Sequence, residues 1–209
     1  MNLLVGAMMA APHPRGSTVA GRIFGVNLKV EPVNEITRAA VLALEVLPEQ
    51  IPFSGLPSET LAFAESDPYR IPMAVLESSQ SESSQSESGQ SESNRVVGFF
   101  VLCWGEEVAH YASSPQTMGF RAFMIDASKQ GRGYGTAVFA VLQKFLLEHF
   151  PEFTELNLTV NLKNPRAYRT YLRAGFEDSG VLYHGGAFGP QHVLSLPIIS
   201  NKNPSLPNR

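Results

Sequence analysis

The sequence predicts a single mixed α/β domain, because helix-type and strand-type patterns share one chain of ordinary domain length. The chain has 209 residues, of which 44% are hydrophobic, so it can bury a core without disulfides or metal ions. Its patterns run in the order strand, helix, helix, three strands, and then strands that alternate with helices. That order favours one mixed sheet, of α/β or α+β type, with helices packed on it.

The individual elements follow from the periodicity of the apolar residues and from capping and breaking residues. Helices are predicted over 34–47, 58–66, 133–149 and 164–174. Strands are predicted over 26–30, 71–76, 95–104, 120–126, 155–162, 181–183 and 193–196. We therefore expect a central sheet of about six or seven strands flanked by about four helices. Residues 71–76 and 95–104 are expected to pair as a hairpin.

Three segments are expected to lie outside the folded domain, which is predicted over 27–198. Residues 1–26 contain a short apolar run that no Lys or Arg precedes, so we expect a disordered extension rather than a signal peptide. Residues 78–94 repeat Gln-Ser-Glu-Ser three times with almost no apolar residue, which predicts a disordered insertion in the hairpin. Residues 199–209 are polar and are predicted to form a flexible tail.

Charge and composition narrow the function classes. The formal net charge of -3 argues against a nucleic-acid partner, and no apolar stretch approaches the roughly 20 residues that span a membrane. The histidines lack zinc-type spacing, so no metal site is predicted. Cys103 is the single cysteine and lies in an apolar run, which predicts an inert thiol and a reducing cytoplasm. We expect a cytoplasmic protein with a small-molecule partner; the oligomeric state is open, with a homodimer as one alternative.

A glycine-rich turn between the strand 120–126 and the helix 133–149 is suited to binding phosphate groups. Gly131, Gly133 and Gly135 fall within five residues, so main-chain amides can approach an anion closely. The start of the helix adds unpaired N–H groups and the positive end of its dipole. Lys129 and Arg132 are candidates for charge-assisted contacts. The alternative is a turn that only packs helix against strand.

Two other phosphate-binding motifs fit this turn less well. A Walker loop requires a Lys before its final Ser or Thr, and no Lys precedes Thr136. A dinucleotide fingerprint requires its third glycine at the position of Thr136. A nucleotide triphosphatase is therefore disfavoured. A flavin- or nucleotide-binding module is an alternative that the second motif, at Asn164, disfavours.

A second motif, Asn-Pro-Arg-Ala-Tyr-Arg-Thr-Tyr-Leu-Arg-Ala-Gly-Phe, begins at Asn164. Asn164 is a good N-cap and Pro165 suits the first helical position. Ala167 and Tyr171 then lie one turn apart on one helix face, and Gly175 ends the helix. Taken alone, this motif favours a well-capped packing helix in which Tyr171 is a core aromatic.

Together, the two motifs resemble the two signatures of the GCN5-related N-acetyltransferase (GNAT) superfamily. Gln130-x-x-Gly133-x-Gly135 resembles the acyl-CoA signature Gln/Arg-x-x-Gly-x-Gly/Ala, and the second motif resembles Asn-x-x-Ala/Ser-x-x-x-Tyr-x-x-x-Gly-Phe. The resemblance covers roughly 27–197 and is weakest before Arg95. It implies a GNAT-like sheet and an acetyl-CoA-dependent N-acetyltransferase, which transfers acetyl directly to a primary amine of a small molecule.

The resemblance also implies the site residues. Tyr171 is implied as the catalytic residue that donates a proton to the leaving thiolate. The residues implied to bind acetyl-CoA are Phe123, Met124, Ile125, Gln130, Gly131, Arg132, Gly133, Tyr134, Gly135, Thr136 and Asn164. Main-chain groups of 123–125 are expected to be free to hydrogen-bond the pantetheine arm as if it were an added strand.

The acceptor and the general base stay open. The Phe-x-Ile-Asp-x-x-x-Gln-Gly-x-Gly run partly resembles polyamine acetyltransferases, which tend to carry an acidic residue nine positions before the Gln. This chain has Arg121 there, which would repel a cationic acceptor unless it faces away. The acidic candidates for the base are Glu45, Glu49, Glu106, Glu107 and Asp126. A non-catalytic acyl-CoA sensor and an acetyltransferase for protein N-termini or lysines are the alternatives.

Overall fold

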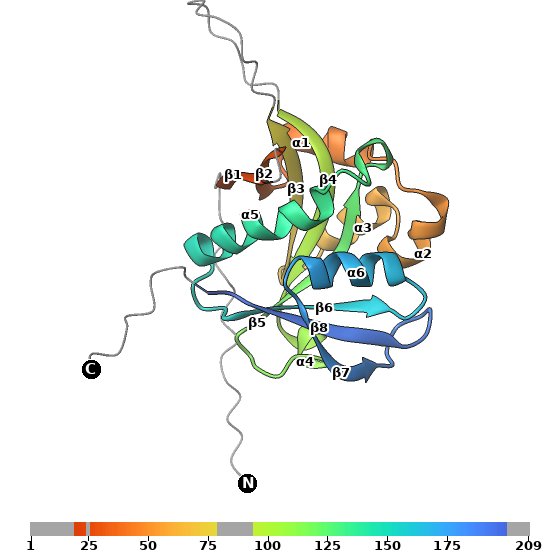
Figure 1. The fold of residues 1–209 in the computed structure, drawn as a ribbon. Helices are drawn as coiled ribbons and strands as arrows, with labels where there is room; N and C mark the ends of the chain where they lie inside the picture. The colour runs from red at the N-terminus through yellow and green to blue at the C-terminus, as the bar shows by residue number, and fades with distance from the viewer. Residues whose placement is uncertain (1–18, 24–25, 79–93, 200–209) are drawn as a thin grey trace, which may run out of the picture.

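The computed structural model describes residues 19–23, 26–78 and 94–199 (Figure 1). They form one eight-stranded sheet in the order β1-β2-β3-β4-β5-β6-β8-β7. The pair β5 and β6 is parallel, and the other neighbouring pairs are antiparallel. The predicted mixed α/β class is confirmed, and so is the hairpin, which β3 and β4 form.

The secondary structure follows the predicted order. The strands are β1 Val19–Ile23, β2 Val26–Pro32, β3 Arg70–Ser78, β4 Asn94–Cys103, β5 Thr117–Ile125, β6 Glu155–Asn161, β7 Glu177–Tyr183 and β8 Gln191–Pro197. The α-helices are α1 Glu35–Leu42, α2 Ile51–Ser54, α3 Pro57–Glu65, α4 Glu106–Ala109, α5 Tyr134–His149 and α6 Pro165–Arg173. The described residues also form the short 3-10 helices η1 Pro48–Gln50 and η2 Ala127–Lys129. The four helices of eight or more residues lie where helices were predicted.

The sheet begins earlier in the chain than the predicted start near Asn27. β1 pairs antiparallel with β2 and places Val19 opposite Val30. β1 was not predicted, because its sequence, Val-Ala-Gly-Arg-Ile, has no clear apolar alternation. With β1 included, the sheet has eight strands, whereas about six or seven were predicted. The predictions of disorder for residues 1–18, 79–93 and 200–209 concern segments outside the described residues.

Helix α1 begins as predicted but ends before residue 47. The Asn34 side-chain oxygen accepts hydrogen bonds from the amides of Ile36 and Thr37, at 2.9 and 3.0 Å. After Leu42 the chain turns toward η2, where the Glu45 amide donates to Asp126 Oδ2 at 3.2 Å. This contact holds the segment after α1 beside the loop that precedes α5.

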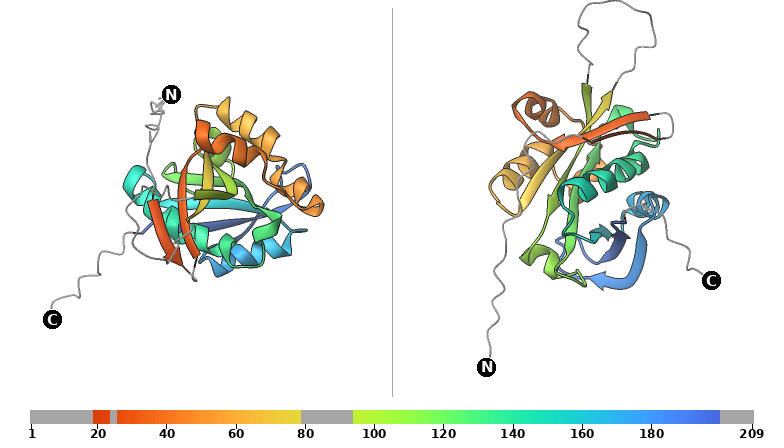
Figure 2. Two further views of the ribbon diagram at one scale, coloured as in Figure 1. Left: turned by 90° about the horizontal axis from the view of Figure 1, so that it is seen from above. Right: turned by 90° about the vertical axis from the view of Figure 1, so that its left-hand side faces the viewer.

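The sheet separates two hydrophobic cores, with helices on both faces (Figure 2). On the face covered by α5 and α6, Phe120 packs between Phe100 and Phe139, with ring centroids 4.9 Å apart in each pair. On the other face, Val41 of α1 and Leu61 of α3 are buried in a second cluster. In the described part of the chain, no helix is long and apolar enough to cross a membrane.

Candidate active site

Strands β5 and β6 pair over only a short stretch and then separate. Their parallel register runs from Thr117, opposite Glu155, to Gly119, opposite Asn157. Beyond this point β5 pairs with β4 alone and β6 with β8 alone. Ala122 in the separated part of β5 has a φ of 53°, the only positive value at a described non-glycine residue. Such backbone strain clusters at functional sites, and the inner edge of β5 here lacks a strand partner.

A cavity of about 870 Å³, a volume typical of ligand sites, adjoins this gap. Nearly all the predicted site residues line it: Phe123, Met124, Ile125, Gln130, Gly131, Gly133, Tyr134, Gly135, Thr136, Asn164 and Tyr171. Arg132 is exposed and lies outside the cavity wall, so its predicted contact stays a prediction. The cavity also reaches α2 and the connection between β7 and β8, which the sequence analysis did not connect with the site.

The glycine-rich turn leaves main-chain amides open at the N-terminus of α5. Gly131 and Gly133 have φ values of 76° and 85°, which favour glycine, and a Cβ at either position would meet no atom within 4 Å. Gly133 is the N-cap, and no side chain caps the helix. The amides of Tyr134 and Gly135 have no acceptor among the described residues. These amides and the helix dipole together favour an anion.

Gln130 fixes the shape of this turn. Its side-chain amide donates to the Ile125 carbonyl at 2.9 Å and to Gln50 Oε1 at 2.8 Å. Gln50 donates back to Gln130 Oε1 at 3.1 Å. Gln130 therefore joins the end of β5 and the end of η1 to the glycine turn. Gln50 gave no signal in the sequence analysis because its partner lies 80 residues away.

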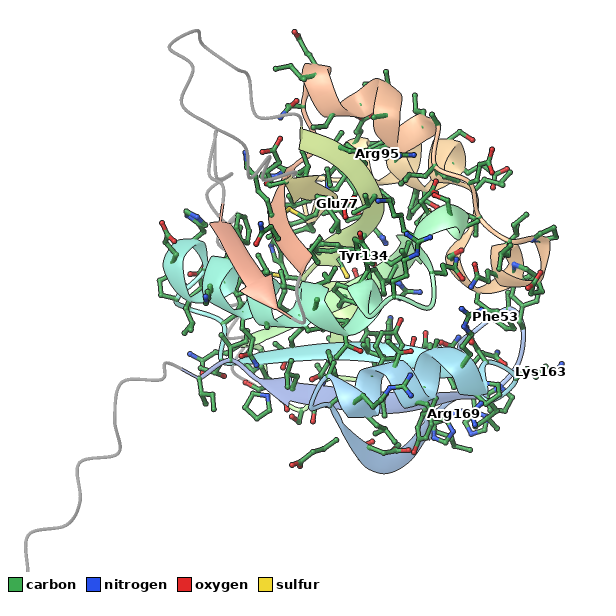
Figure 3. All side chains as sticks on the ribbon, turned by 45° about the horizontal axis from the view of Figure 1, so that its top comes forward. Phe53, Glu77, Arg95, Tyr134, Lys163 and Arg169 are labelled. Atoms are coloured by element: carbon green, nitrogen blue, oxygen red, sulfur yellow. The ribbon has the colours of Figure 1, made fainter. Side chains whose placement is uncertain are left out.

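Two residues near the turn bind a carboxylate of the protein itself. The Tyr134 hydroxyl donates to Glu77 of β3, and the same carboxylate forms an ion pair with Lys129. Figure 3 shows Glu77 and Tyr134 close together. Burial opposes ionisation of Glu77, but the hydrogen bonds from Lys129 and Tyr134 outweigh it and hold its pKa below the ordinary value. Tyr134 can thus offer a ligand its main-chain amide but not its hydroxyl, and the Lys129 ammonium is already paired with Glu77.

Helix α6 contributes positive charge to the cavity that was not predicted from the sequence. Arg166, Thr170 and Arg173 line the cavity, and a Cβ on Gly135 would lie 3.2 Å from Thr170 Cγ2. Neither arginine has an ion pair with the described carboxylates. Their spacing on one helix face was the signal that was available. Arg166, Thr170 and Arg173 therefore lie on the face of α6 that is turned toward the open N-terminus of α5.

Tyr171 is half-buried in the cavity wall. Its ring lies 5.8 Å from the ring of Phe139 and 5.8 Å from that of Phe176. Its hydroxyl has no hydrogen-bond partner among the described residues. Burial raises the pKa of the phenol above its ordinary value, so the hydroxyl stays protonated. Asn164 also lines the cavity, and its Oδ1 caps α6 by accepting from the Ala167 amide at 3.1 Å.

The far end of the cavity contains a network of ion pairs. Glu107 of α4 is the only described carboxylate residue in the wall. One of its oxygens lies 2.5 Å from Arg121 Nη1, and the other is bound by Arg70. Arg70 also pairs with Asp67 at 2.9 Å. Arg121 therefore faces the cavity, although Glu107 offsets its charge. The other acidic candidates, Glu45, Glu49, Glu106 and Asp126, do not line the cavity.

Comparison with known families identifies the fold and the class of enzyme. The sequence model of the Acetyltransferase (GNAT) family matches residues 61–176. The chain belongs to this family. It is therefore an acyltransferase of the N-acetyltransferase type, and the predicted resemblance is confirmed.

Solved structures of acetyltransferases share the fold of this GNAT chain. The aminoglycoside acetyltransferase AAC(6')-Ib in complex with coenzyme A has a TM-score of 0.61 and 18% identity, covering 81% of this chain and 94% of that one. A spermidine N-acetyltransferase SpeG chimera from Vibrio cholerae and hSSAT has a TM-score of 0.57 and 13% identity, covering 82% and 95%. No curated protein matches the sequence. At these identities the likeness shows the fold alone.

The cavity presents two kinds of group that suit a phosphate-containing ligand with an amide chain. The open amides at α5 and the arginines of α6 suit phosphate groups, and the unpaired edge of β5 suits an extended amide chain. Within residues 19–23, 26–78 and 94–199, no group of three or more His, Cys, Asp or Glu is placed to hold a metal ion. The wall of the cavity thus supplies main-chain amides, arginines and the tyrosines Tyr134, Tyr171 and Tyr183.

Proposed function

We propose that this protein transfers acetyl from acetyl-CoA directly to a primary amine of a small molecule. The observation that carries the proposal is one continuous cavity with the open N-terminus of α5 and the hydroxyl of Tyr171 in its wall. The phosphates bind at α5, and the pantetheine arm follows the free edge of β5. The thioester then lies within reach of Tyr171.

The reaction forms one bond and breaks another without an enzyme-bound intermediate. The amine nitrogen attacks the thioester carbonyl carbon, the C–N bond forms, and the C–S bond breaks to release a thiolate. Tyr171 donates a hydrogen bond and then its proton to the sulfur, and recovers a proton that the nitrogen loses. Positioning of both reactants in the cavity supplies on the order of 7 to 11 kcal/mol of the barrier.

The amine must reach the thioester in its neutral form. Glu107 is the only described carboxylate in the wall, and both its oxygens are bound by arginines. Neither oxygen of Glu107 is therefore directed at the amine. We therefore assign deprotonation of the amine to water in the open cavity, and expect the rate to rise with pH until the amine is neutral.

A ligand screen followed by a turnover assay tests this proposal. Acetyl-CoA at 100 times its Kd should add about 2.7 kcal/mol of stability, and NAD and ATP should add none. Release of the CoA thiol should then depend on an added amine. Stabilisation by ATP alone would contradict acetyl-CoA as the ligand. Binding of acetyl-CoA without turnover on any amine, peptide or protein would favour the non-catalytic sensor.

A further inference from the structure

Two exposed aromatic rings lie in the wall of the cavity. Phe53 of α2 and Phe188 of the β7–β8 connection have exposed fractions of 37% and 53%. Their chain neighbours Pro52 and Ala187 also line the cavity. Figure 3 shows Phe53 on the side of the molecule that carries Lys163. Apolar side chains that are left exposed in a cavity mark a surface that a ligand covers.

Among the described residues, the cavity has no carboxylate oxygen without an arginine partner. Arg121 and Arg70 occupy the two oxygens of Glu107, which is the only described acidic residue in the wall. Arg166 and Arg173 lie in the wall at the donor end, where the phosphates of acetyl-CoA are proposed to bind. A second ammonium group at the acceptor end would therefore meet Arg121 and a carboxylate that arginines already engage.

We infer that the acceptor is a primary monoamine with an apolar, preferably aromatic, substituent, and that polycationic amines are poor acceptors. The inference rests on the proposed acetyl transfer to a small amine. The substituent packs against Phe53 and Phe188, where aromatic rings bury a large area in a preferred geometry. The fold shared with acetyltransferases of aminoglycosides and spermidine does not fix this choice, because Phe53, Phe188 and Glu107 lie outside the acyl-donor motifs.

An acceptor panel tests the inference on the unmodified protein. Thiol release is measured at saturating acetyl-CoA with 2-phenylethylamine, spermidine and kanamycin. The kcat/KM for 2-phenylethylamine should exceed that for either polycation by at least about tenfold, as expected of a fitted apolar pocket. An equal or higher kcat/KM for spermidine or kanamycin would overturn the inference and leave the proposed acetyl transfer intact.

Variants of the two rings test where the substituent binds. Phe53→Ala and Phe188→Ala should each raise the KM for 2-phenylethylamine by about tenfold and leave affinity for acetyl-CoA unchanged. Ile36→Ala is the matched control, because Ile36 is an apolar side chain on α1 that is 90% exposed and lies outside the cavity. An unchanged KM in both Phe variants would contradict the assigned pocket.

A charge variant tests the role of the arginines. Arg121→Gln leaves Glu107 with one arginine, so the ratio of kcat/KM for spermidine to that for 2-phenylethylamine should rise by about tenfold. Arg121→Met, which preserves the packing of the aliphatic stem, should raise the same ratio. An unchanged ratio in both variants would contradict the charge argument.

Acetyl-CoA binding is measured in parallel. Failure to bind acetyl-CoA, or binding without turnover on any amine, would overturn the proposed function itself.

Discussion

The two ends of the cavity are built in different ways. The donor end consists of the turn 130–136, the start of α5 and helix α6, and it presents main-chain amides and a few side chains from two short segments. The acceptor end combines α2, α4, part of β5 and the β7–β8 connection, and it presents mainly side chains. In the proposed function, main-chain atoms, which every residue has, bind the donor, whereas individual side chains select the acceptor.

This difference explains why similar folds can act on unlike amines. A main-chain anion site depends on backbone angles at Gly131 and Gly133, and few sequences satisfy them. The acceptor end depends on which side chains occupy α2, α4 and the β7–β8 connection, and many combinations are compatible with the fold. Variants at each end should therefore affect donor binding and acceptor selection separately.

The largest effect is expected at Tyr171, which belongs to the donor end but acts on the chemical step. Tyr171→Phe should lower kcat by about 10² to 10⁴-fold, because it removes a proton donor, and should leave the KM for acetyl-CoA nearly unchanged. Tyr168→Phe is the control on the same helix. The Tyr168 hydroxyl donates a hydrogen bond of 3.0 Å to Asp178, and Tyr168 does not line the cavity. Steady-state rates and melting temperatures on the same preparations separate catalysis from packing. A wild-type kcat in Tyr171→Phe would remove Tyr171 from the mechanism.

A second test concerns the main-chain site. Gly133→Val should weaken acetyl-CoA binding by at least about a hundredfold, because the branched side chain disfavours the φ of 85° and occupies the space before the amides. Gly180→Val is the matched control: Gly180 also has a positive φ, 73°, with open space around its Cβ position, but lies outside the cavity. Calorimetric titration should show normal binding in the control. Similar losses in both variants would attribute the effect to backbone strain alone.

The arginines of α6 should have a smaller effect that depends on salt. Arg166→Gln and Arg173→Gln should each weaken binding of acetyl-CoA by about tenfold at low salt, and by less as salt increases. Arg169→Gln is the control, because Arg169 is exposed on the same helix but does not line the cavity. Repeating the measurement with dephospho-CoA identifies the phosphate that each arginine holds. Equal affinities for acetyl-CoA in all three variants would mean that the arginines do not contribute and that the main-chain amides alone bind the phosphates.

The smallest effect should appear only at the acceptor end. A Cβ on Gly119 would lie 2.6 Å from Cys103 Sγ and 2.7 Å from Val108 Cγ2, so Gly119→Ala should displace α4 and with it Glu107. Overpacking of this kind costs about 1 to 3 kcal/mol of stability. The KM for the amine should rise a few-fold while affinity for acetyl-CoA stays unchanged. Adding Cys103→Ala should recover part of the loss, and a loss of acetyl-CoA binding would show that the two ends are coupled.

Local sequence patterns were sufficient for much of the fold and for the donor end. Asn34 and Asn164 were predicted as N-caps and do cap α1 and α6, because a cap depends on residues within one helical turn. The glycine turn was predicted for the same reason, since its backbone angles are set by the residue types in the turn. Helix α1 shows the limit of this reasoning: its apolar pattern continues past Leu42, but the contact between Glu45 and Asp126 turns the chain away.

The sequence by itself determined the mixed α/β class, the order of its elements, the glycine turn and the helix that carries Tyr171. Only the tertiary structure decided that Gln130 pairs with Gln50, that Tyr134 binds Glu77, and that Arg70 and Arg121 neutralise Glu107. These partners lie 80, 57 and, for Arg70 and Glu107, 37 residues apart. The physical reason is that caps and turns are fixed by neighbours in the chain, whereas charge pairing in a cavity depends on which strands the sheet brings together.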